Sequence, residues 1–232
     1  MNTGQVMVQQ SQQGGGSPII RGFEANRILL VVDGVRMNNA IYRSGHLQNA
    51  ITVDPNSLEQ VQIIMGPSSV TYGSDALGGV VHFQTHRPRF RRDGSEDTWA
   101  VFASAQTLTN NNSSVVSARV EGGGEKWASL VSISKSEYGD LRMGENRMHG
   151  DSAWGLATHY IDSIGGVDVV LENSDPNLQV GTGYDQTDFM HKLRLAIPGG
   201  ALQTNVQYSI SSDIPRYDKI NNISDTFSPT WA

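Results

Sequence analysis

The part of the chain after Pro88 consists of segments in which polar and apolar side chains alternate. From Leu202 to Ile210 every second residue is apolar except Thr204, and the residues between them are Gln203, Asn205, Gln207 and Ser209. Because successive side chains of a strand point to opposite faces, such a segment has one polar and one apolar face. The pattern therefore predicts a sheet with water on one side and an apolar environment on the other.

Five such strands are predicted, and the connections between them alternate in length. The strands are Thr98 to Gln106, Ser114 to Glu121, Lys126 to Glu137, Asp188 to Ile197 and Ala201 to Ser211. Gly122 to Glu125 and Pro198 to Gly200 are tight turns, whereas the segment from Tyr138 to Thr187 is long and irregular. Short turns at one end and long loops at the other are typical of a transmembrane β-barrel. A soluble β-sandwich alternates in the same way, so periodicity leaves both architectures open.

A membrane contact would have to be made by strands. The longest aliphatic run, Ile28 to Val32, is far shorter than the roughly 20 residues that cross a bilayer as a helix. Rings near the predicted strand ends would then form an aromatic girdle at the membrane surface. These rings belong to Trp99, Trp127, Tyr138 and Tyr208.

Composition excludes several classes of function. With 17 basic and 23 acidic side chains, the net charge of -6 argues against general binding of nucleic acid. The absence of cysteine removes disulfides, thiolate metal sites and cysteine catalysis. A charged fraction of 17% with 25 glycines favours strands and turns over a helical bundle. No GxSxG, HExxH or complete phosphate-binding loop occurs, so no catalytic residues are predicted and the protein is not expected to be an enzyme.

The residues before Pro88 have a different sequence pattern, which predicts a separate, compact domain. Short aliphatic strands are broken by Gly and Asn turns, and Asp33-Gly34 is a chain-reversal signal. The strands predicted here are Ile28 to Val32, Val35 to Met37, Val61 to Met65 and Gly79 to Thr85, with a short helix around Pro55 to Leu58. We therefore expect two domains, residues 1–88 and residues 89–232.

Two segments of the first domain carry a family resemblance. Ile20-Arg21-Gly22-Phe23 with Leu29 to Asn38 (LLVVDGVRMN), and then Leu58 to Phe83 (LEQVQIIMGPSSVTYGSDALGGVVHF), resemble the plug domain of TonB-dependent outer-membrane receptors. The resemblance implies a mixed α/β plug followed by antiparallel strands of a partial transmembrane β-barrel. The positions that match the plug motif are Gly22, Asp33, Gly34, Gly66, Pro67, Tyr72, Gly73, Gly78 and Gly79.

Glycines of this motif also have a direct physical interpretation. Gly66-Pro67 ends a buried strand, Gly73 permits a positive φ, and Gly78-Gly79 allows the chain to approach a neighbouring wall closely. The alternative is that each of them only forms a turn in a mixed α+β domain.

Arg21 is the expected link between plug and barrel, because in the family the matching arginine meets barrel glutamates. A guanidinium is well suited to bidentate pairing with a carboxylate. The family has a second arginine before the Gly-Pro pair, where this chain has Met65. The glutamate partners are expected beyond Ala232.

The apical loop from Tyr42 to Asn49 carries the expected ligand contacts. Its resemblance to a histidine-bearing loop of haem receptors implies that His46 is an axial ligand of haem iron, with Tyr42 and Arg43 binding a propionate or another anionic chelate. The alternative is a solvated loop histidine. Later segments resemble the haem and haemoglobin receptor branch. They are Asp140 to Gly144, Gln179 to Tyr184 and Ile214 to Asp218.

Other histidines predict less. His82 and His86 are four residues apart, about 13 Å on a strand, so no metal clip is expected. The other three histidines lie in or beside the long loop, where they either contact a ligand or a host protein or have no function. They are His149, His159 and His191.

The resemblance implies an active transporter in the outer membrane of a Gram-negative bacterium. Its ligand would be haem or a haem protein first, and a ferric siderophore or cobalamin next. Its partners would be a TonB-type energy-transducing protein and outer-membrane lipid, with no intrinsic cofactor and no nucleic acid. A surface adhesin or soluble β-rich binding module is the alternative from another class, and it would not need a plug.

Five strands are too few for a closed barrel. Plugged outer-membrane transporters have about 22 strands and the smallest bacterial barrels about eight. An open edge in hydrocarbon would leave backbone groups unpaired. Met1 to Gln13 has no apolar core of a signal peptide. We therefore expect an internal piece of a larger receptor.

Overall fold

The computed structural model describes residues 6–9, 13, 17–23, 27–37, 52–66, 72, 76–91, 96, 98–144 and 155–212. These residues are nearly all strand, so the predicted mixed α/β character of the first domain is not confirmed. The helix expected around Pro55 is a single 3-10 turn, η3 (Pro55–Ser57), capped by Asp54. No helix in the described part of the chain is long and apolar enough to span a membrane.

A four-stranded sheet, called here the small sheet, forms the first part of the structure. Its order is β4-β3-β6-β5, with β3 and β6 parallel and the other pairs antiparallel. The small sheet is built from β3 (Ile28–Val32), β4 (Val35–Arg36), β5 (Leu58–Met65) and β6 (Gly79–Thr85). Each of the four strands predicted before Pro88 overlaps one of these strands.

The core of the small sheet lies on both faces of β3 and β6, as the unbroken aliphatic sequence of β3 predicts. On one face Leu30 and Val81 pack with Ile20 from the hairpin of β1 (Val6–Gln9) and β2 (Ser17–Ile20). On the other face Val31 and Val80 pack with Ala76.

A two-residue turn joins β3 to β4. Val32 pairs with Val35, and Asp33 and Gly34 have φ values of 49° and 87°. Two positive φ values in a two-residue loop are typical of a type I′ hairpin turn, for which Asp-Gly is a favoured pair. The predicted chain reversal is confirmed, and it places the Asp33 side chain at the end of a buried strand.

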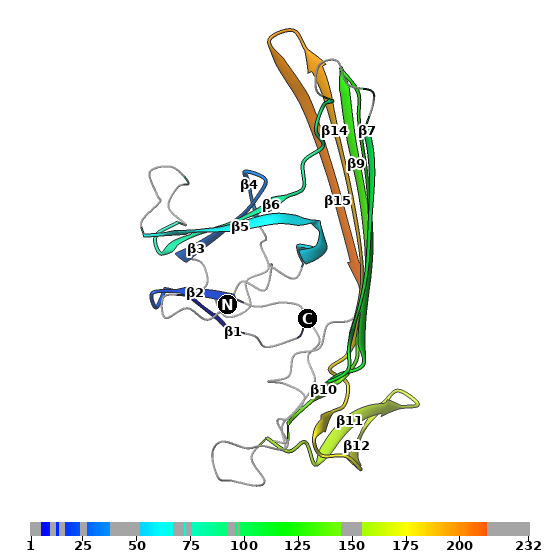
Figure 1. Ribbon diagram of the computed structural model, residues 1–232. Coiled ribbons are helices and arrows are strands. Elements are labelled where there is room, and N and C mark those ends of the chain that lie inside the picture. The colour runs from blue at the N-terminus through cyan, green and yellow to red at the C-terminus, as the bar shows by residue number, and fades with distance from the viewer. Residues whose placement is uncertain are drawn as a thin grey trace.

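A five-stranded antiparallel sheet, called here the long sheet, forms the second part, in the order β15-β14-β9-β8-β7. Each predicted strand after Pro88 overlaps one of its members. They are β7 (Thr98–Leu108), β8 (Ser113–Gly123), β9 (Trp127–Tyr138), β14 (Tyr184–Ile197) and β15 (Gly200–Ser211). Figure 1 shows the long sheet as a tall, gently curved layer with the small sheet beside it.

The long sheet has the two faces that alternation predicts. One face, called here the outer face, carries exposed apolar side chains in register across all five strands. Its middle row is Val101, Val120, Val131, His191 and Val206. The inner face is mostly polar on β9, β14 and β15, and its residues include Ser132, Ser134, Gln186, Asp188, Lys192, Asn205 and Gln207. His191 therefore lies on the outer face, with Ser129 3.2 Å away, and not beside the long loop as predicted.

The long connection between β9 and β14 is not irregular as predicted. It contains β10 (Leu141–Arg142) paired with β13 (Leu178–Gln179), and a hairpin of β11 (His159–Ile164) and β12 (Val167–Glu172). Figure 1 shows this hairpin beyond one end of the long sheet.

Aromatic rings gather at both ends of the long sheet. Trp99 and Trp127 lie at the end with the tight turns, with ring centroids 5.7 Å apart. At the other end Tyr138 stacks on the buried Tyr184 with centroids 4.7 Å apart. Because that pair belongs to the inner face, the predicted place of Tyr138 in an aromatic girdle is wrong.

Candidate functional site

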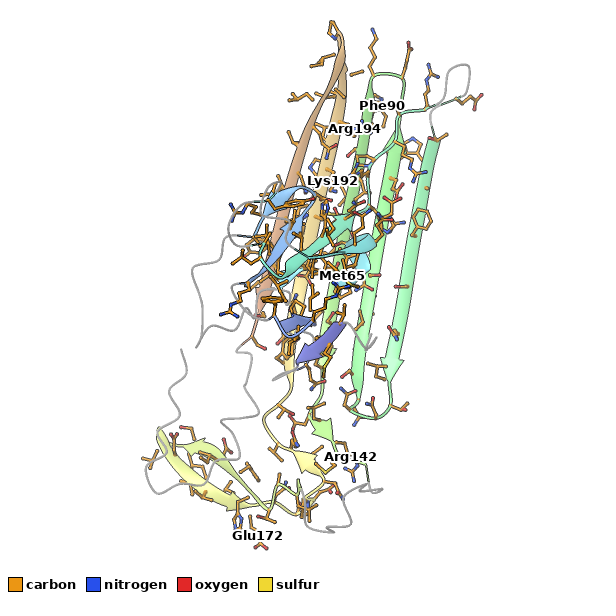
Figure 2. All side chains as sticks on the ribbon, turned by 90° about the vertical axis from the view of Figure 1, so that its left-hand side faces the viewer. Met65, Phe90, Arg142, Glu172, Lys192 and Arg194 are labelled. Carbon is orange, nitrogen blue, oxygen red and sulfur yellow. The ribbon has the colours of Figure 1, made fainter. Side chains whose placement is uncertain are left out.

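An ion pair joins the small sheet to the inner face of the long sheet. Lys192 Nζ donates to Asp33 Oδ2 at 2.7 Å, with side-chain exposures of 0% and 10%. Asn205 pairs with Lys192 across β14 and β15, and its Nδ2 donates to the same oxygen at 3.0 Å. Figure 2 labels Lys192 where the small sheet lies in front of the long sheet.

The carboxylate of Asp33 is also held from its own sheet. The Thr85 amide donates to Oδ1 at 2.9 Å, and the Thr85 hydroxyl donates to Oδ2 at 2.7 Å. Burial by itself raises the pKa of Asp33, but the hydrogen bonds from Lys192 and Thr85 outweigh it and bring the pKa below its ordinary value. Asp33 is therefore an anion at neutral pH, with a cation as its buried partner.

The lowered pKa gives the contact a defined pH dependence. The Asp33 contribution to stability is fully present above the usual aspartate pKa of about 3.9 and is lost as the pH falls through the lowered value. We expect the stability difference between the wild type and Asp33→Asn to stay constant from about pH 5 to 8 and to shrink below about pH 4, where both side chains are neutral. Urea unfolding of both proteins across this pH range measures the stability difference. A difference that already shrinks between pH 7 and 5 would contradict the assignment.

A second contact is made by Asp54, the N-cap residue of η3. Its Oδ1 accepts from the Asn56 amide at 2.8 Å, as an N-cap requires. Its Oδ2 accepts from the hydroxyl of Ser134 on β9 at 2.9 Å, and both side chains are buried. The same carboxylate therefore caps the start of a local turn and links that turn to the long sheet.

An open pocket of about 310 Å³, lined by both polar and apolar residues, lies beside this second contact, between η3 and strands β14 and β15. Asp54 and the buried Asp188 face it from the two sides. Both oxygens of Asp188 accept from Gln186 Nε2, at 2.9 and 3.0 Å. The contact between the two sheets is thus polar and incompletely packed here.

A third contact is made by the linker that leads from β6 to β7. Arg194 Nη1 donates to the carbonyl of Pro88 at 3.2 Å, and its guanidinium lies over the Phe90 ring, 5.0 Å from the centroid. Arg91 also reaches Glu125, in the turn between β8 and β9, at 3.3 Å. Figure 2 shows Phe90 and Arg194 together above Lys192. The linker is therefore fastened to the tight-turn end of the long sheet.

Several predicted site residues lie outside the described residues. They are Tyr42, Arg43, His46, Pro67 and Gly73. Arg21 and Gly22 form an exposed turn with φ values of 50° and 83°, and the barrel contact of Arg21 stays a prediction. Gly66 ends β5 with a φ of 96°, and Tyr72 packs against the core of the small sheet.

The glycine pair at positions 78 and 79 makes a close approach, but not to the long sheet as predicted. A Cβ on Gly79 would lie 2.7 Å from the carbonyl oxygen of Ile64 on β5, and a Cβ on Gly78 would lie 2.4 Å from the Cβ of Phe23. Both neighbours belong to the first part of the structure. These glycines therefore serve packing within that part.

Sequence reasoning missed the long-sheet half of the contact, namely Lys192, Asn205 and Ser134. One signal was available for Lys192, because it occupies a polar-face position in the middle of a predicted strand. Lysine is almost never fully buried without a partner. The sequence does not show that the partner is Asp33, which is 159 residues away.

The site as a whole is a polar contact between the two sheets. In the described part of the chain no group of three or more His, Asp or Glu side chains could hold a metal ion. The arrangement positions one sheet against the other.

The sequence comparisons point to one family for the first part of the chain. The TonB-dependent receptor plug domain matches residues 2–80. A hemin receptor of Yersinia pestis is 30% identical over 129 residues, which cover 55% of this chain and 18% of that receptor. The vitamin B12 transporter BtuB of Vibrio vulnificus is 43% identical over 82 residues, 34% of this chain and 13% of the transporter. The matched regions thus cover less than a fifth of these relatives.

Solved structures share the fold over most of the chain. The copper transporter OprC superposes with a TM-score of 0.65 at 13% identity, covering 89% of this chain and 27% of the transporter. The FrpB iron transporter from Neisseria meningitidis superposes with a TM-score of 0.62 at 16% identity, covering 88% and 27%. Both the small and the long sheet are therefore arranged as in parts of these transporters.

Proposed function

We propose that this chain takes part in the active import of a bulky solute. The premise is that the chain belongs to the TonB-dependent receptors and carries their plug domain at residues 2–80. The membrane is the outer membrane of a Gram-negative bacterium. A TonB-type protein supplies the force that displaces the plug. The family consists of receptors and transporters, not of enzymes.

The observation that carries this proposal is the docking of the small sheet on the polar face of the long sheet. The Asp33–Lys192 ion pair holds it there, while the opposite face of the long sheet carries exposed apolar side chains on each of its five strands. A barrel strand in lipid turns its apolar side outward and its polar side toward the lumen. The small sheet then occupies the lumen as a plug.

The polar character of the contact suits a plug that has to move. A typical hydrogen bond contributes only about 1 kcal/mol net, because water replaces a lost partner. The cavity between η3 and β14 leaves part of the contact unpacked. A directed pull can therefore open the contact stepwise, whereas the buried ion pair resists spontaneous opening.

Haem or a haem protein is the ligand that we favour. The match to the hemin receptor extends over 129 residues, more than the plug domain alone contains, and so supports this choice. In our proposal His46 binds haem iron as an axial ligand and Tyr42 and Arg43 contact a propionate. A ferric siderophore or cobalamin is the second choice, favoured by the 43% identity to the vitamin B12 transporter.

Replacing His46 with alanine tests the haem assignment. We expect haemin to bind at least roughly tenfold more weakly, since even the loss of a partner behind a metal ligand costs about that much. Haemin titration followed by the Soret absorbance of the purified protein measures it. His191→Ala is the control, because the structure places His191 on the outer face of the long sheet, opposite the face that meets the small sheet. Equal titration curves for all three proteins would remove His46 as a ligand.

Import itself is tested in cells that use haemin as their iron source. Deleting the gene should abolish growth on haemin but not on a soluble iron salt, and loss of the TonB-type protein should have the same effect. A protein that fractionates with the soluble proteins, without heat-modifiable mobility in gels, would favour the alternative of a β-rich binding module or adhesin.

A further inference from the structure

Gln13 joins the first hairpin of the plug domain to the loop end of the long sheet. It lies between β1 and β2, and its Nε2 donates to the Gly139 carbonyl at 2.6 Å, with a longer contact of 3.5 Å to the Thr182 carbonyl. Its Oε1 accepts from Asn111 Nδ2 at 2.6 Å. Its carbonyl accepts from the hydroxyl of Tyr184 at 2.9 Å. One side-chain amide therefore has partners at both of its ends.

The partners of Gln13 belong to two connections of the long sheet. Asn111 lies in the turn between β7 and β8, while Gly139 and Thr182 are the first and nearly the last residues of the long connection between β9 and β14. Any shift at the base of this long connection changes the positions of the two carbonyl oxygens. Because Gln13 contacts both of these oxygens, the shift acts on Gln13 directly.

The base of the long connection is itself firmly closed. Asp140 Oδ1 accepts from the amides of Thr182 and Gly183, both at 2.8 Å. The buried hydroxyl of Thr182 accepts from the Leu141 amide at 2.8 Å and donates to the Gln179 carbonyl at 2.7 Å. This network continues into the β10–β13 pair and from there toward the β11–β12 hairpin.

Close backbone packing leaves the base little room to adjust. A Cβ on Gly139 would lie 2.0 Å from the Asn111 carbonyl oxygen, and a Cβ on Gly183 would lie 2.6 Å from the Tyr138 carbonyl oxygen. A tightly packed element tends to move as a unit between discrete positions. Displacement of the loop should therefore reach Gln13 without being absorbed on the way.

We propose that Gln13 is a positioning residue that transmits the position of the long outer connection to the plug. The proposal rests on the proposed function, in which this connection faces the solute outside the cell. With the connection in its present position, Gln13 holds the β1–β2 hairpin against the long sheet. When the connection moves, the amide nitrogen loses the carbonyl oxygens of Gly139 and Thr182, and the hairpin loosens.

The test measures hydrogen exchange in the full chain in detergent micelles, without any solute. Gln13→Glu keeps the size of the side chain but replaces the donor toward Gly139 by a second acceptor. We expect exchange of the β1 and β2 amides to rise about tenfold, while amides of β3 and β6 change less than about twofold. Gln60→Glu is the matched control, because Gln60 is an exposed plug residue bound to Gln84.

A second variant distinguishes transmission from a merely structural role. Asp140→Ala opens the base of the long connection, and Asp140 forms no hydrogen bond with the described residues of the plug. We expect it to raise exchange of the β1 and β2 amides as much as Gln13→Glu does, and the double variant to show no further increase. Effects confined to residues 139–183, or additive in the double variant, would overturn the proposal.

The outcomes remain separable from those of the import experiment. Should Gln13→Glu unfold the small sheet as well, the β3 amides would report it, and the milder Asp140→Asn would then decide by the same comparison. Failure of haemin-dependent growth would leave the exchange result standing. Failure of the exchange result would leave the proposed import untouched.

Discussion

Replacing Lys192 with methionine is expected to weaken the docking of the small sheet on the long sheet by about 3–5 kcal/mol, the cost of removing one partner from a buried ion pair. The methionine fills much of the same space, so the loss is mainly electrostatic. The Asp33 carboxylate would be left in a buried place with hydrogen bonds from Thr85 and Asn205 but no cation.

Protection of the small sheet from trypsin measures this docking, because Arg27 and Arg36 offer cleavage sites on either side of β3. Lys135→Met is the matched control, since Lys135 pairs with Glu137 on the same sheet but with side chains 58% and 57% exposed. Such an exposed pair contributes little to stability, because water screens it. Adding Asp33→Asn to Lys192→Met should recover part of the loss, because neither charge then remains buried alone. Equal protection in Lys192→Met and Lys135→Met would contradict the assigned role.

Replacing Val206 with arginine is expected to impair membrane insertion, at a cost of about 2–4 kcal/mol for a cation at the bilayer midplane. Val206 is 54% exposed and belongs to the middle row of the outer face, which crosses all five strands of the long sheet. In lipid, an arginine in this row would have neither water nor a counterion within reach.

The neighbouring Gln207→Arg provides the control for orientation. Gln207 is next to Val206 on β15 but lies on the inner face, where it lines the cavity that also contains Asp54 and Asp188. An arginine there has anionic neighbours and water. We expect Gln207→Arg to insert nearly as well as the wild type, measured as the folded fraction that resists urea extraction from vesicles. Equal loss in both variants would contradict a lipid-facing outer surface.

Local sequence patterns predicted the strands well, because their causes are local. Alternation in Leu202 to Ile210 follows from the period of the strand, and the Asp33-Gly34 turn follows from the φ values that these residues tolerate. The β11–β12 hairpin was missed although its signal is of the same kind. Gly165 and Gly166, with φ values of 62° and 82°, form a two-residue turn between two short segments that contain β-branched residues.

The contacts between the two sheets had no such local signal. The sequence placed Asp33 at a turn and Lys192 within a strand, and it assigned no role to Gln13. It also suggested that Gly78 and Gly79 approach the second domain, whereas the structure uses them against β5 and Phe23.

Taken by itself, the sequence determined that the chain has two parts, that the second part has one polar and one apolar face, and that the first part carries a plug motif. Only the tertiary structure decided that Lys192 meets Asp33, that Ser134 meets Asp54, and that Gln13 reaches the connections at the loop end of the long sheet. Alternation and turns depend on neighbouring residues, which the sequence shows directly. Pairing across 159 residues depends on how two sheets are placed against each other, and that placement comes from the packing of the whole chain.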